Sequence, residues 1–358
     1  MRQRISNSDA LLALQRGLTG SRVLAGTRYM DDPACLAAYA DYYMAVSMAQ
    51  AIRACAISGL RPSSVLDMGA GPGSVSLALA GLGARSFTLV DSSPGALSMA
   101  SDALAVMSRE SGEPFAVSTV VADLESPLLP LPPGATYDLV AFGHCLNEIG
   151  GADTGAGAAT LARRLAIVMR SAAFLAPGGS VLIMEPATLQ AGRAAIALRD
   201  RLVAAGWAVN SPCSIAGPCP ALAAGPTTTC HDESSWDVPT VVRSLAQGAG
   251  LDRDLIKMTW FVLRPPPAEG GGLVVVPSPG DSYRVVSAPM LNKGGRVRYL
   301  LCGPSGRFPF SARKDDENAA HEGFFSLGRY DLVTIAEPEF REGGWGFGPR
   351  TRIKRLDR

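Results

Sequence analysis

Apolar residues along this chain gather into short runs separated by segments with helical spacing. Five runs have the length of buried strands: residues 64–68, 87–90, 118–121, 137–142 and 180–184. The segments 75–82 and 158–175 between them carry apolar residues at helical spacing. This alternation predicts an α/β fold in which a parallel sheet carries helices on both faces.

Polar side chains lie at or just beyond the ends of these predicted strands. They are Asp67, Asp91, Asp123, Asn147 and Glu185. Ligands of parallel α/β sheets bind at the carboxyl ends of the strands, so we expect these residues to surround a binding site.

The segment 67–73 reads D-x-G-x-G-x-G between the first strand and the following helix. Its spacing departs from the dinucleotide pattern G-x-G-x-x-G and matches the loop with which class I methyltransferases bind S-adenosylmethionine (SAM). A Cβ atom at these glycines would block the ligand or forbid the turn. The alternative is an ordinary glycine-rich turn.

Asp91 ends the second strand, eighteen residues after Gly73. A carboxylate there can accept hydrogen bonds from both ribose hydroxyls. Asp123, after the third strand, is placed to contact the adenine amino group. The predicted cofactor-binding residues are Asp67, Gly69, Ala70, Gly71, Gly73, Asp91, Ser92, Asp123 and Leu124.

Composition narrows the class of protein. The 358 residues are 47% hydrophobic and 18% charged, which supports a sizeable core and argues against wholesale disorder. The net charge of +1 predicts no strong general attraction to nucleic acid. We expect no membrane span, because no run approaches about 18 apolar residues. The arginines of residues 2–22 resemble a mitochondrial presequence, but the pattern at 11–14 fits a first helix equally well.

Four of the seven cysteines lie in segments rich in proline and glycine: Cys213, Cys219, Cys230 and Cys302. Such loops run over the surface, where free thiols are a liability, whereas four thiolates can hold zinc or an iron–sulfur cluster. The spacing is looser than the C-x2-C pairs of common zinc sites. In a zinc site His231 could replace Cys302, and disulfides are disfavoured in an intracellular fold. Cys35, Cys55 and Cys145 are predicted to be core or helix residues.

Several motifs occur together across most of the chain. They are the tyrosine-rich segment 36–43, the loop 66–73, His-Cys-Leu-Asn-Glu-Ile at 144–149, the Pro-Cys segments at 212–213 and 217–220, Cys230-His231 and Cys302. With them the chain resembles the methyltransferase-like family associated with the mitochondrial small ribosomal subunit, and its bacterial relatives. It departs from the family's pattern at Ser214-Ile215, Thr229 and Asp232, where histidine, tryptophan and phenylalanine are usual.

The resemblance implies a [4Fe-4S] cluster on Cys213, Cys219, Cys230 and Cys302, with zinc as the alternative. It also implies a role on the small ribosomal subunit, with its rRNA and ribosomal proteins as partners. The compartment would be a bacterial cytoplasm or the mitochondrial matrix. We expect a monomer away from the ribosome.

Asn147 and Glu148 are the catalytic candidates, because they follow the fourth strand, where nucleic-acid enzymes of this class often clamp a flipped base. The Pro-Pro-aromatic part of such a clamp is absent. Glu148 could be a general base; the alternative is a structural carboxylate. Three functions therefore remain open: an rRNA methyltransferase, a non-catalytic assembly factor that uses SAM and the cluster structurally, and a small-molecule methyltransferase.

The predicted organisation is a Rossmann-like class I methyltransferase core with an N-terminal helical cap and a small C-terminal β module. The cap spans residues 1–58, the SAM-binding domain with its cysteine loop 59–264, and the β module with a basic tail 265–358. A helix at 238–249 and a strand at 257–264 complete the core. The module's predicted strands are 273–277, 283–288, 296–302 and 331–335. Its tail carries five basic residues: Arg350, Arg352, Lys354, Arg355 and Arg358.

Overall fold

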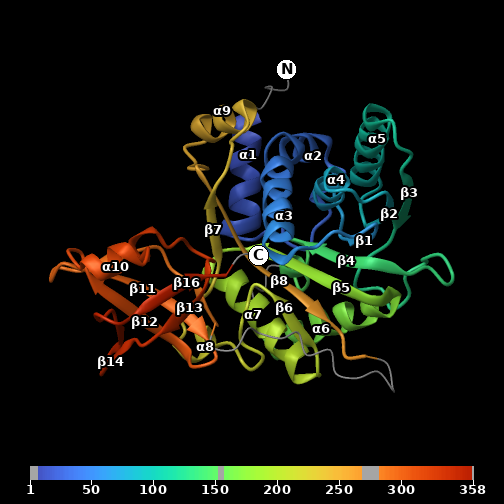
Figure 1. Ribbon diagram of the computed structural model, residues 1–358. Helices are drawn as coiled ribbons and strands as arrows, with labels where there is room; N and C mark the ends of the chain where they lie inside the picture. Colours follow the sequence, from blue (N-terminus) through green and yellow to red (C-terminus); the bar gives the residue numbers. More distant parts are fainter. Residues whose placement is uncertain (1–6, 152–156, 268–281, 357–358) are drawn as a thin grey trace.

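The computed structural model describes residues 7–151, 157–267 and 282–356. Within these ranges the chain forms two eight-stranded sheets, with helices packed on the first (Figure 1). The predicted Rossmann-like α/β core, with helices before it and strands after it, is confirmed.

The first sheet has the strand order β3-β2-β1-β4-β5-β8-β6, and β7 also pairs with β8. Its strands are β1 (Ser64–Met68), β2 (Ser86–Asp91), β3 (Ala116–Val121), β4 (Tyr137–Gly143), β5 (Leu175–Pro186), β6 (Ala208–Ser211), β7 (Asp232–Ser235) and β8 (Leu255–Arg264). β1 to β5 are parallel, as predicted, whereas β8 runs antiparallel to β5, β6 and β7. The direction of β8 was not predicted, because an apolar run carries no information on strand direction.

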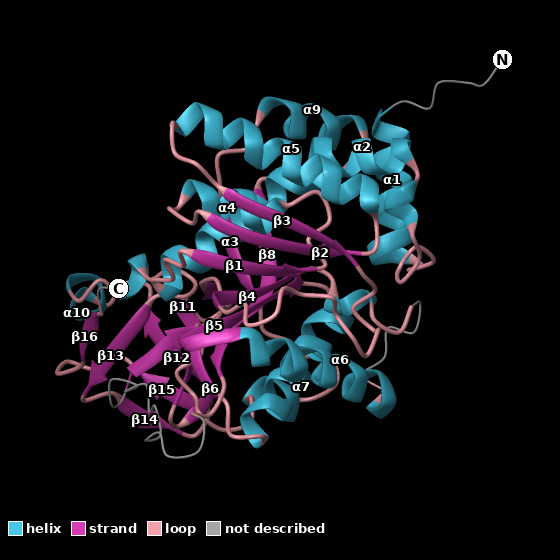
Figure 2. Ribbon diagram, turned by 90° about the vertical axis from the view of Figure 1, so that its right-hand side faces the viewer, coloured by secondary structure: helices cyan, strands magenta, loops and turns pink. Residues whose placement is uncertain are grey.

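Helices cover both faces of this sheet. Figures 1 and 2 show α3, α4 and α5 on one face and α6 and α7 on the other. The helices are α1 (Asn7–Gln15), α2 (Pro33–Tyr39), α3 (Ala45–Ser58), α4 (Ser74–Gly81), α5 (Pro94–Ser111), α6 (Ala158–Ser171), α7 (Leu189–Ala204), α8 (Pro220–Ala223), α9 (Thr240–Gly248) and α10 (Glu317–His321). Short helical turns η1 to η6 lie at 16–20, 29–31, 40–44, 146–148, 172–174 and 324–326.

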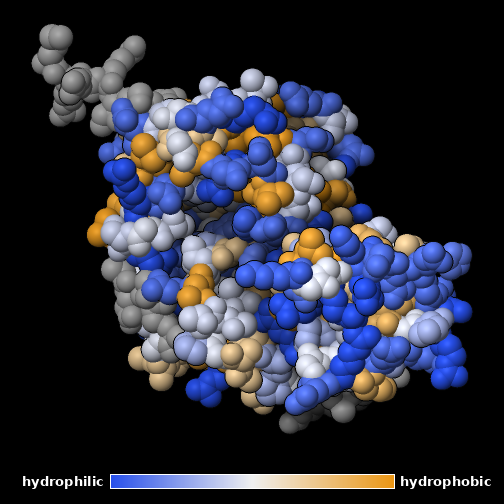
Figure 3. All heavy atoms as spheres, turned by 90° about the vertical axis from the view of Figure 1, so that its left-hand side faces the viewer, coloured by the Kyte–Doolittle hydropathy of each residue, from blue (hydrophilic) through white to orange (hydrophobic). Residues whose placement is uncertain are grey.

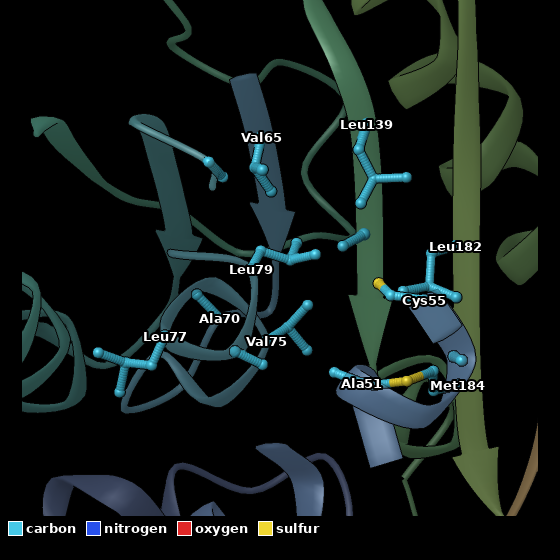
Figure 4. Close-up of a cluster of buried hydrophobic side chains, with 14 of the residues drawn as sticks. Ala51, Cys55, Val65, Ala70, Val75, Leu77, Leu79, Leu139, Leu182 and Met184 are labelled. Atoms are coloured by element: carbon cyan, nitrogen blue, oxygen red, sulfur yellow. The ribbon is translucent and has the colours of Figure 1, made fainter. Parts of the chain in front are cut away.

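The central strands are apolar on both faces because helices cover both. Val65, Leu139 and Leu182 point toward α3 and α4, where Figure 4 shows them near Cys55 and Val75. The residues that follow them, Leu66, Val140 and Ile183, belong to the cluster on the α6–α7 face. This double burial explains why the strands read as continuous apolar runs rather than as alternating ones.

The N-terminal helices pack on the core. Leu11 of α1 is fully buried with Tyr42 and with Val242 of α9. The pattern at 11–14 therefore belongs to a packed first helix. In the described ranges, none of the helices has the length and apolar character needed to cross a bilayer.

The second sheet has the order β14-β15-β12-β11-β9-β13-β16, with β10 paired to β11. Its strands are β9 (Ser282–Val285), β10 (Met290–Leu291), β11 (Arg296–Gly303), β12 (Gly306–Arg313), β13 (Leu332–Ala336), β14 (Glu339–Arg341), β15 (Gly344–Gly346) and β16 (Arg352–Arg355). The predicted strand 273–277 lies outside the described residues. β12 was not predicted, since Pro309 and its arginines obscure the apolar alternation.

The basic tail is an edge strand rather than a free extension. β16 pairs antiparallel with β13. Three arginines of the basic tail form ion pairs: Arg350 with Glu337 at 3.0 Å, Arg352 with Glu322 at 3.5 Å and Arg355 with Asp331 at 3.3 Å. Arg358 lies outside the described residues. The side of the molecule seen in Figure 3 is predominantly hydrophilic, and its apolar side chains are scattered.

Candidate functional site

The glycine loop leaves β1 in a conformation that glycine favours. Gly69, Gly71 and Gly73 have φ angles of +70°, +52° and +86°. A Cβ atom on Gly69 would lie 2.6 Å from Cys145 Cβ, and one on Gly73 would lie 2.8 Å from Ala100 Cβ. These two glycines are therefore needed for the turn and for close packing against the chain itself, and Gly69 also lines the cavity described below.

Two carboxylates hold the loop. Asp67 Oδ2 accepts hydrogen bonds from the Ser76 amide at 3.2 Å and hydroxyl at 2.7 Å, tying β1 to α4. Asp91 Oδ2 accepts from the Gly71 amide at 2.8 Å and Oδ1 from the Ser93 amide at 2.9 Å. The Ser92 amide also donates to this carboxylate, which keeps lone-pair capacity to accept from a ligand hydroxyl.

A cavity of about 210 Å³ lies at the carboxyl ends of β1, β2 and β4. All the predicted cofactor-binding residues line it except Gly73. Its outer wall is residues 26–30 of the N-terminal region, which sequence reasoning missed. The one feature of the sequence that could have indicated these residues is Tyr29, which lies close to the tyrosine-rich segment 36–43. No local pattern predicts that residues 26–30 lie over the sheet.

The two catalytic candidates have different surroundings in η4. Asn147 is buried, and its Oδ1 accepts from Arg22 at 3.1 Å while its Nδ2 donates to the His144 carbonyl at 2.7 Å. Its own amide donates to Glu185 Oε1 at 3.2 Å. Asn147 therefore holds the turn together. Glu148 instead lines the cavity and accepts from the Tyr29 hydroxyl at 3.3 Å.

The site concentrates carboxyl groups that resist ionisation. Burial raises the pKa of Asp67 to about 6, that of Glu185 to about 7 and that of Glu148 to about 8. Burial also raises the pKa of Asp91. Asp67 Oδ1 is buried and has no hydrogen-bond partner among the described residues. A bound cation would stabilise these carboxylates; Arg28, a basic side chain of the cavity wall, pairs with Asp31 at 2.7 Å.

The four cysteines predicted to bind a metal group line one small cavity of about 30 Å³. Cys213, Cys219 and Cys230 come from the segment between β6 and β7, and Cys302 comes from β11 of the second sheet. His231 does not line this cavity, and its Nε2 lies 3.8 Å from Glu233. In the described residues, no group of three or more His, Cys, Asp or Glu side chains is arranged to hold a metal ion.

The cysteine cavity lies where the second sheet docks on the first. Ser214 Oγ donates to the Cys302 carbonyl at 3.1 Å, and Arg284 Nε donates to the Pro212 carbonyl at 2.8 Å. Tyr330 stacks on Trp260 with ring centroids 6.4 Å apart, and its hydroxyl lies 3.9 Å from Cys230 Sγ. The two sheets therefore meet around the sulfur atoms.

Arginines surround the four thiols. Burial raises the pKa of Cys213 to about 12, against the opposing effect of Arg199 and Arg284. Burial likewise raises the pKa of Cys230, against Arg307 and Arg329. Arg199 is fully buried and Arg284 nearly so. Arg199 pairs with Asp200 at 2.6 Å, and the positive charge of Arg199 and Arg284 beside Cys213 favours the thiolate form of that cysteine.

A second cavity, of about 310 Å³, adjoins the first one. The two share five wall residues: Tyr29, Tyr39, Ser47, His144 and Glu148. Glu148 therefore stands between a site for the predicted cofactor and a space large enough for a second molecule.

The profile of the family described as "Mitochondrial small ribosomal subunit Rsm22" matches residues 34–255, which is more than half of the chain. The chain belongs to the Rsm22 family. The resemblance inferred from the sequence motifs is thereby confirmed. No curated protein sequence matches the chain.

Solved structures with a similar fold include methyltransferases. A ribosomal protein L11 methylase from Lactobacillus delbrueckii subsp. bulgaricus is 14% identical, with 62% of this chain and 77% of that chain covered and a TM-score of 0.35. An O-methyltransferase family protein from Burkholderia thailandensis is 16% identical, with 74% and 73% covered and a TM-score of 0.40.

Proposed function

We propose that this Rsm22-family protein is a SAM-binding, methyltransferase-like factor of the small ribosomal subunit. The observation that carries the SAM site is the cavity between the glycine loop, Asp91 and Glu148. SAM brings a sulfonium and an ammonium group, and the carboxyls of Asp67, Asp91 and Glu148 offer the opposite charge. The ribose hydroxyls would donate to Asp91, and the adenine would lie near Asp123 and Leu124.

Replacing Asp91 with alanine should weaken SAM binding about 10- to 150-fold. This is the range expected for losing hydrogen bonds to a charged group, about 1.5–3 kcal/mol. Isothermal titration calorimetry on wild type and Asp91→Ala tests it, with Asp102→Ala, an exposed aspartate on α5, as the matched control. Equal affinities, or a wild type that binds neither SAM nor its demethylated product, would remove the cofactor from the proposal.

Association with small-subunit rRNA and ribosomal proteins is the second part of the proposal, and it rests on membership of the Rsm22 family. Such particles occur in a bacterial cytoplasm or a mitochondrial matrix, and away from them we propose a monomer. With a net charge of +1 the protein has no strong overall attraction to nucleic acid, so its phosphate contacts would come from individual basic patches on its surface.

We expect the full-length protein to retain small-subunit rRNA in an affinity pulldown and to lose it as salt rises. Phosphate contacts release counterions, and six to ten of them cost about 10³–10⁵ in affinity between 50 and 200 mM salt. Sequencing of the recovered RNA measures the result, with large-subunit rRNA as the internal control. Recovery of neither small-subunit rRNA nor ribosomal proteins at low salt would contradict this part.

We further propose that Cys213, Cys219, Cys230 and Cys302 hold a [4Fe-4S] cluster. The four cysteines line one common cavity, and the family resemblance implies an iron–sulfur cluster there, with zinc as the alternative. The surrounding arginines suit a buried group with net negative charge. When bound, the cluster supplies iron–sulfur bonds that cross-link β11 to the 213–230 segment.

Two roles remain for the SAM site. A non-catalytic assembly factor is favoured by Asn147, whose side chain is engaged within the turn. Methyl transfer is favoured by the second cavity beside Glu148, because a purely structural cofactor needs no adjoining space for an acceptor. Of the two candidates for catalysis, Glu148 is thus the one we propose as a proton acceptor and Asn147 as a positioning residue.

A further inference from the structure

The second cavity lies against the proposed SAM site but has its own wall. Tyr43, Gln50 and Arg253 line it without lining the first cavity. Its mouth includes the exposed residues Thr188 and Lys257. Because Glu148 lines both cavities, a molecule in the second cavity would reach it beside the proposed cofactor site.

Resting on the proposed SAM site, we propose that this cavity receives a single unstacked nucleobase of single-stranded RNA as the methyl acceptor.

Aromatic walls favour a flat ligand. Tyr29, Tyr39 and Tyr43 all line the cavity, and the rings of Tyr39 and Tyr43 lie 5.3 Å apart at an angle of 31°. Proteins that bind single-stranded RNA commonly stack unpaired bases on such side chains. A ring held here needs no Pro-Pro-aromatic clamp.

Two polar side chains of the wall, His144 and Tyr43, are neutral at pH 7 and can form hydrogen bonds with the edge of a base. Burial lowers the pKa of His144 to about 4 and raises that of Tyr43 to about 12. Gln50 Nε2 donates to the Lys257 carbonyl at 2.9 Å, so Gln50 Oε1 accepts from His144 Nε2 at 2.7 Å. His144 Nδ1 is then a hydrogen-bond acceptor, suited to a base amide or amine.

Positive side chains near the mouth suit the RNA backbone. Lys257 is exposed and pairs with Glu233 at 2.9 Å, and the Arg253 guanidinium lies 5.2 Å from the Tyr42 ring centroid. A phosphate of the strand would compete with Glu233 for Lys257, and lysine–phosphate contacts position a strand without reading its sequence.

The transfer step balances with the groups present. The lone pair of an acceptor nitrogen on the base forms the N–CH₃ bond while the C–S bond of SAM breaks. The bonding pair remains on sulfur, which becomes a neutral thioether. The extra proton on the nitrogen passes to ionised Glu148 and then to water.

The test measures binding of five-nucleotide single-stranded RNAs by fluorescence anisotropy, with the demethylated product of SAM at saturating concentration. Tyr43→Ala should weaken RNA binding about 5- to 150-fold, the range for losing one stacking partner, and leave affinity for the SAM product unchanged. Because Tyr43 also packs on Tyr42, Ala187→Trp is the second variant, which narrows the mouth without removing a packed ring. Phe340→Ala, an exposed aromatic on β14, is the matched control and should change nothing.

The outcomes separate the two proposals. A wild type that does not bind the SAM product contradicts the proposed function itself. A wild type that binds it but binds no RNA, or binds RNA equally well with Tyr43→Ala and Ala187→Trp, overturns the acceptor site alone. Equal loss of RNA binding in Phe340→Ala would also overturn it, since the effect would not come from the cavity.

Discussion

Replacing Cys302 with serine should bleach the anaerobically purified protein and loosen the second sheet. Cys302 is the one proposed ligand on β11, so its loss breaks the proposed link between the two sheets. Apparent binding energies of structural metal sites are about 10–16 kcal/mol in small zinc peptides. We therefore expect the free energy of unfolding to fall by about 5 kcal/mol or more. Visible absorption, iron and sulfide content and chemical denaturation measure the two effects.

The loosening should be local. The contacts of Arg284 with Pro212 and of Tyr330 with Trp260 remain in the variant, so the second sheet should stay docked but exchange its amide hydrogens faster. The strands around the glycine loop should keep their protection. Hydrogen exchange measured by mass spectrometry distinguishes the two regions.

The control is Cys35→Ser. Cys35 lies partly exposed on α2, where a hydroxyl remains hydrated, whereas Cys55 is fully buried and its serine variant would leave a polar group in the core. A colourless wild type that holds one zinc would refute the iron–sulfur cluster and leave the four-thiolate site. A Cys302→Ser variant that matches wild type in colour and stability would refute the site altogether.

The sequence predicted the parts of the fold that depend on local pattern. β1 was predicted at its observed bounds, since a doubly buried strand reads as an uninterrupted apolar run. The glycine loop and Asp91 were recognisable because the loop directly follows β1 and the carboxylate directly ends β2, a spacing typical of this kind of binding site. The direction of β8 and the strands β12 and β16 were not predicted, because strand direction and edge pairing depend on long-range contacts.

The walls of the candidate sites also depend on long-range contacts. Residues 26–30 form a wall of the first cavity only because α1 to α3 pack over the sheet. Arg22 and Asn147, 125 positions apart, bond in the buried turn, and no spacing rule predicts that pair. The grouping of Cys302 with the three earlier cysteines followed from their proline- and glycine-rich segments and from family resemblance, and not from spacing.

As pH rises, the stability of the ligand-free protein should fall while its affinity for SAM should increase. In the free protein burial holds the pKa of Glu148 at about 8, well above its ordinary value of 4.5. Tyr29 bonds to it, and Asp91 and Glu185 face it as further acids. A raised acid pKa contributes stability that is complete below pH 4.5 and is lost as pH rises through 8. Glu185 and Asp67, with pKa values of about 7 and 6, act in the same direction.

The ligand-free protein should therefore become less stable between about pH 5 and pH 8. For each of these groups, every unit by which burial raises the pKa corresponds to a loss of about 1.4 kcal/mol in the free energy of unfolding. SAM binding should strengthen over the same range, because its positive groups favour ionised Glu148. If only the ionised form binds, affinity rises up to roughly 500-fold from pH 5 to pH 8. Thermal unfolding with and without SAM across this range measures both trends, and the stabilisation by SAM should grow with pH.

Glu148→Gln should reduce the slope of both profiles, because glutamine keeps the shape and the Tyr29 contact but cannot ionise. The part of the stability slope that comes from Glu185 and Asp67 should remain. Glu110→Gln, on the exposed side of α5, is the matched control and should keep the wild-type slopes. SAM affinity that is constant from pH 5 to pH 8 in wild type would contradict a role for Glu148 beside the cofactor. Equal slopes in wild type and Glu148→Gln would instead assign the pH dependence to Asp67 or Asp91, which line the same cavity, or to Glu185, which accepts from the Asn147 amide outside it.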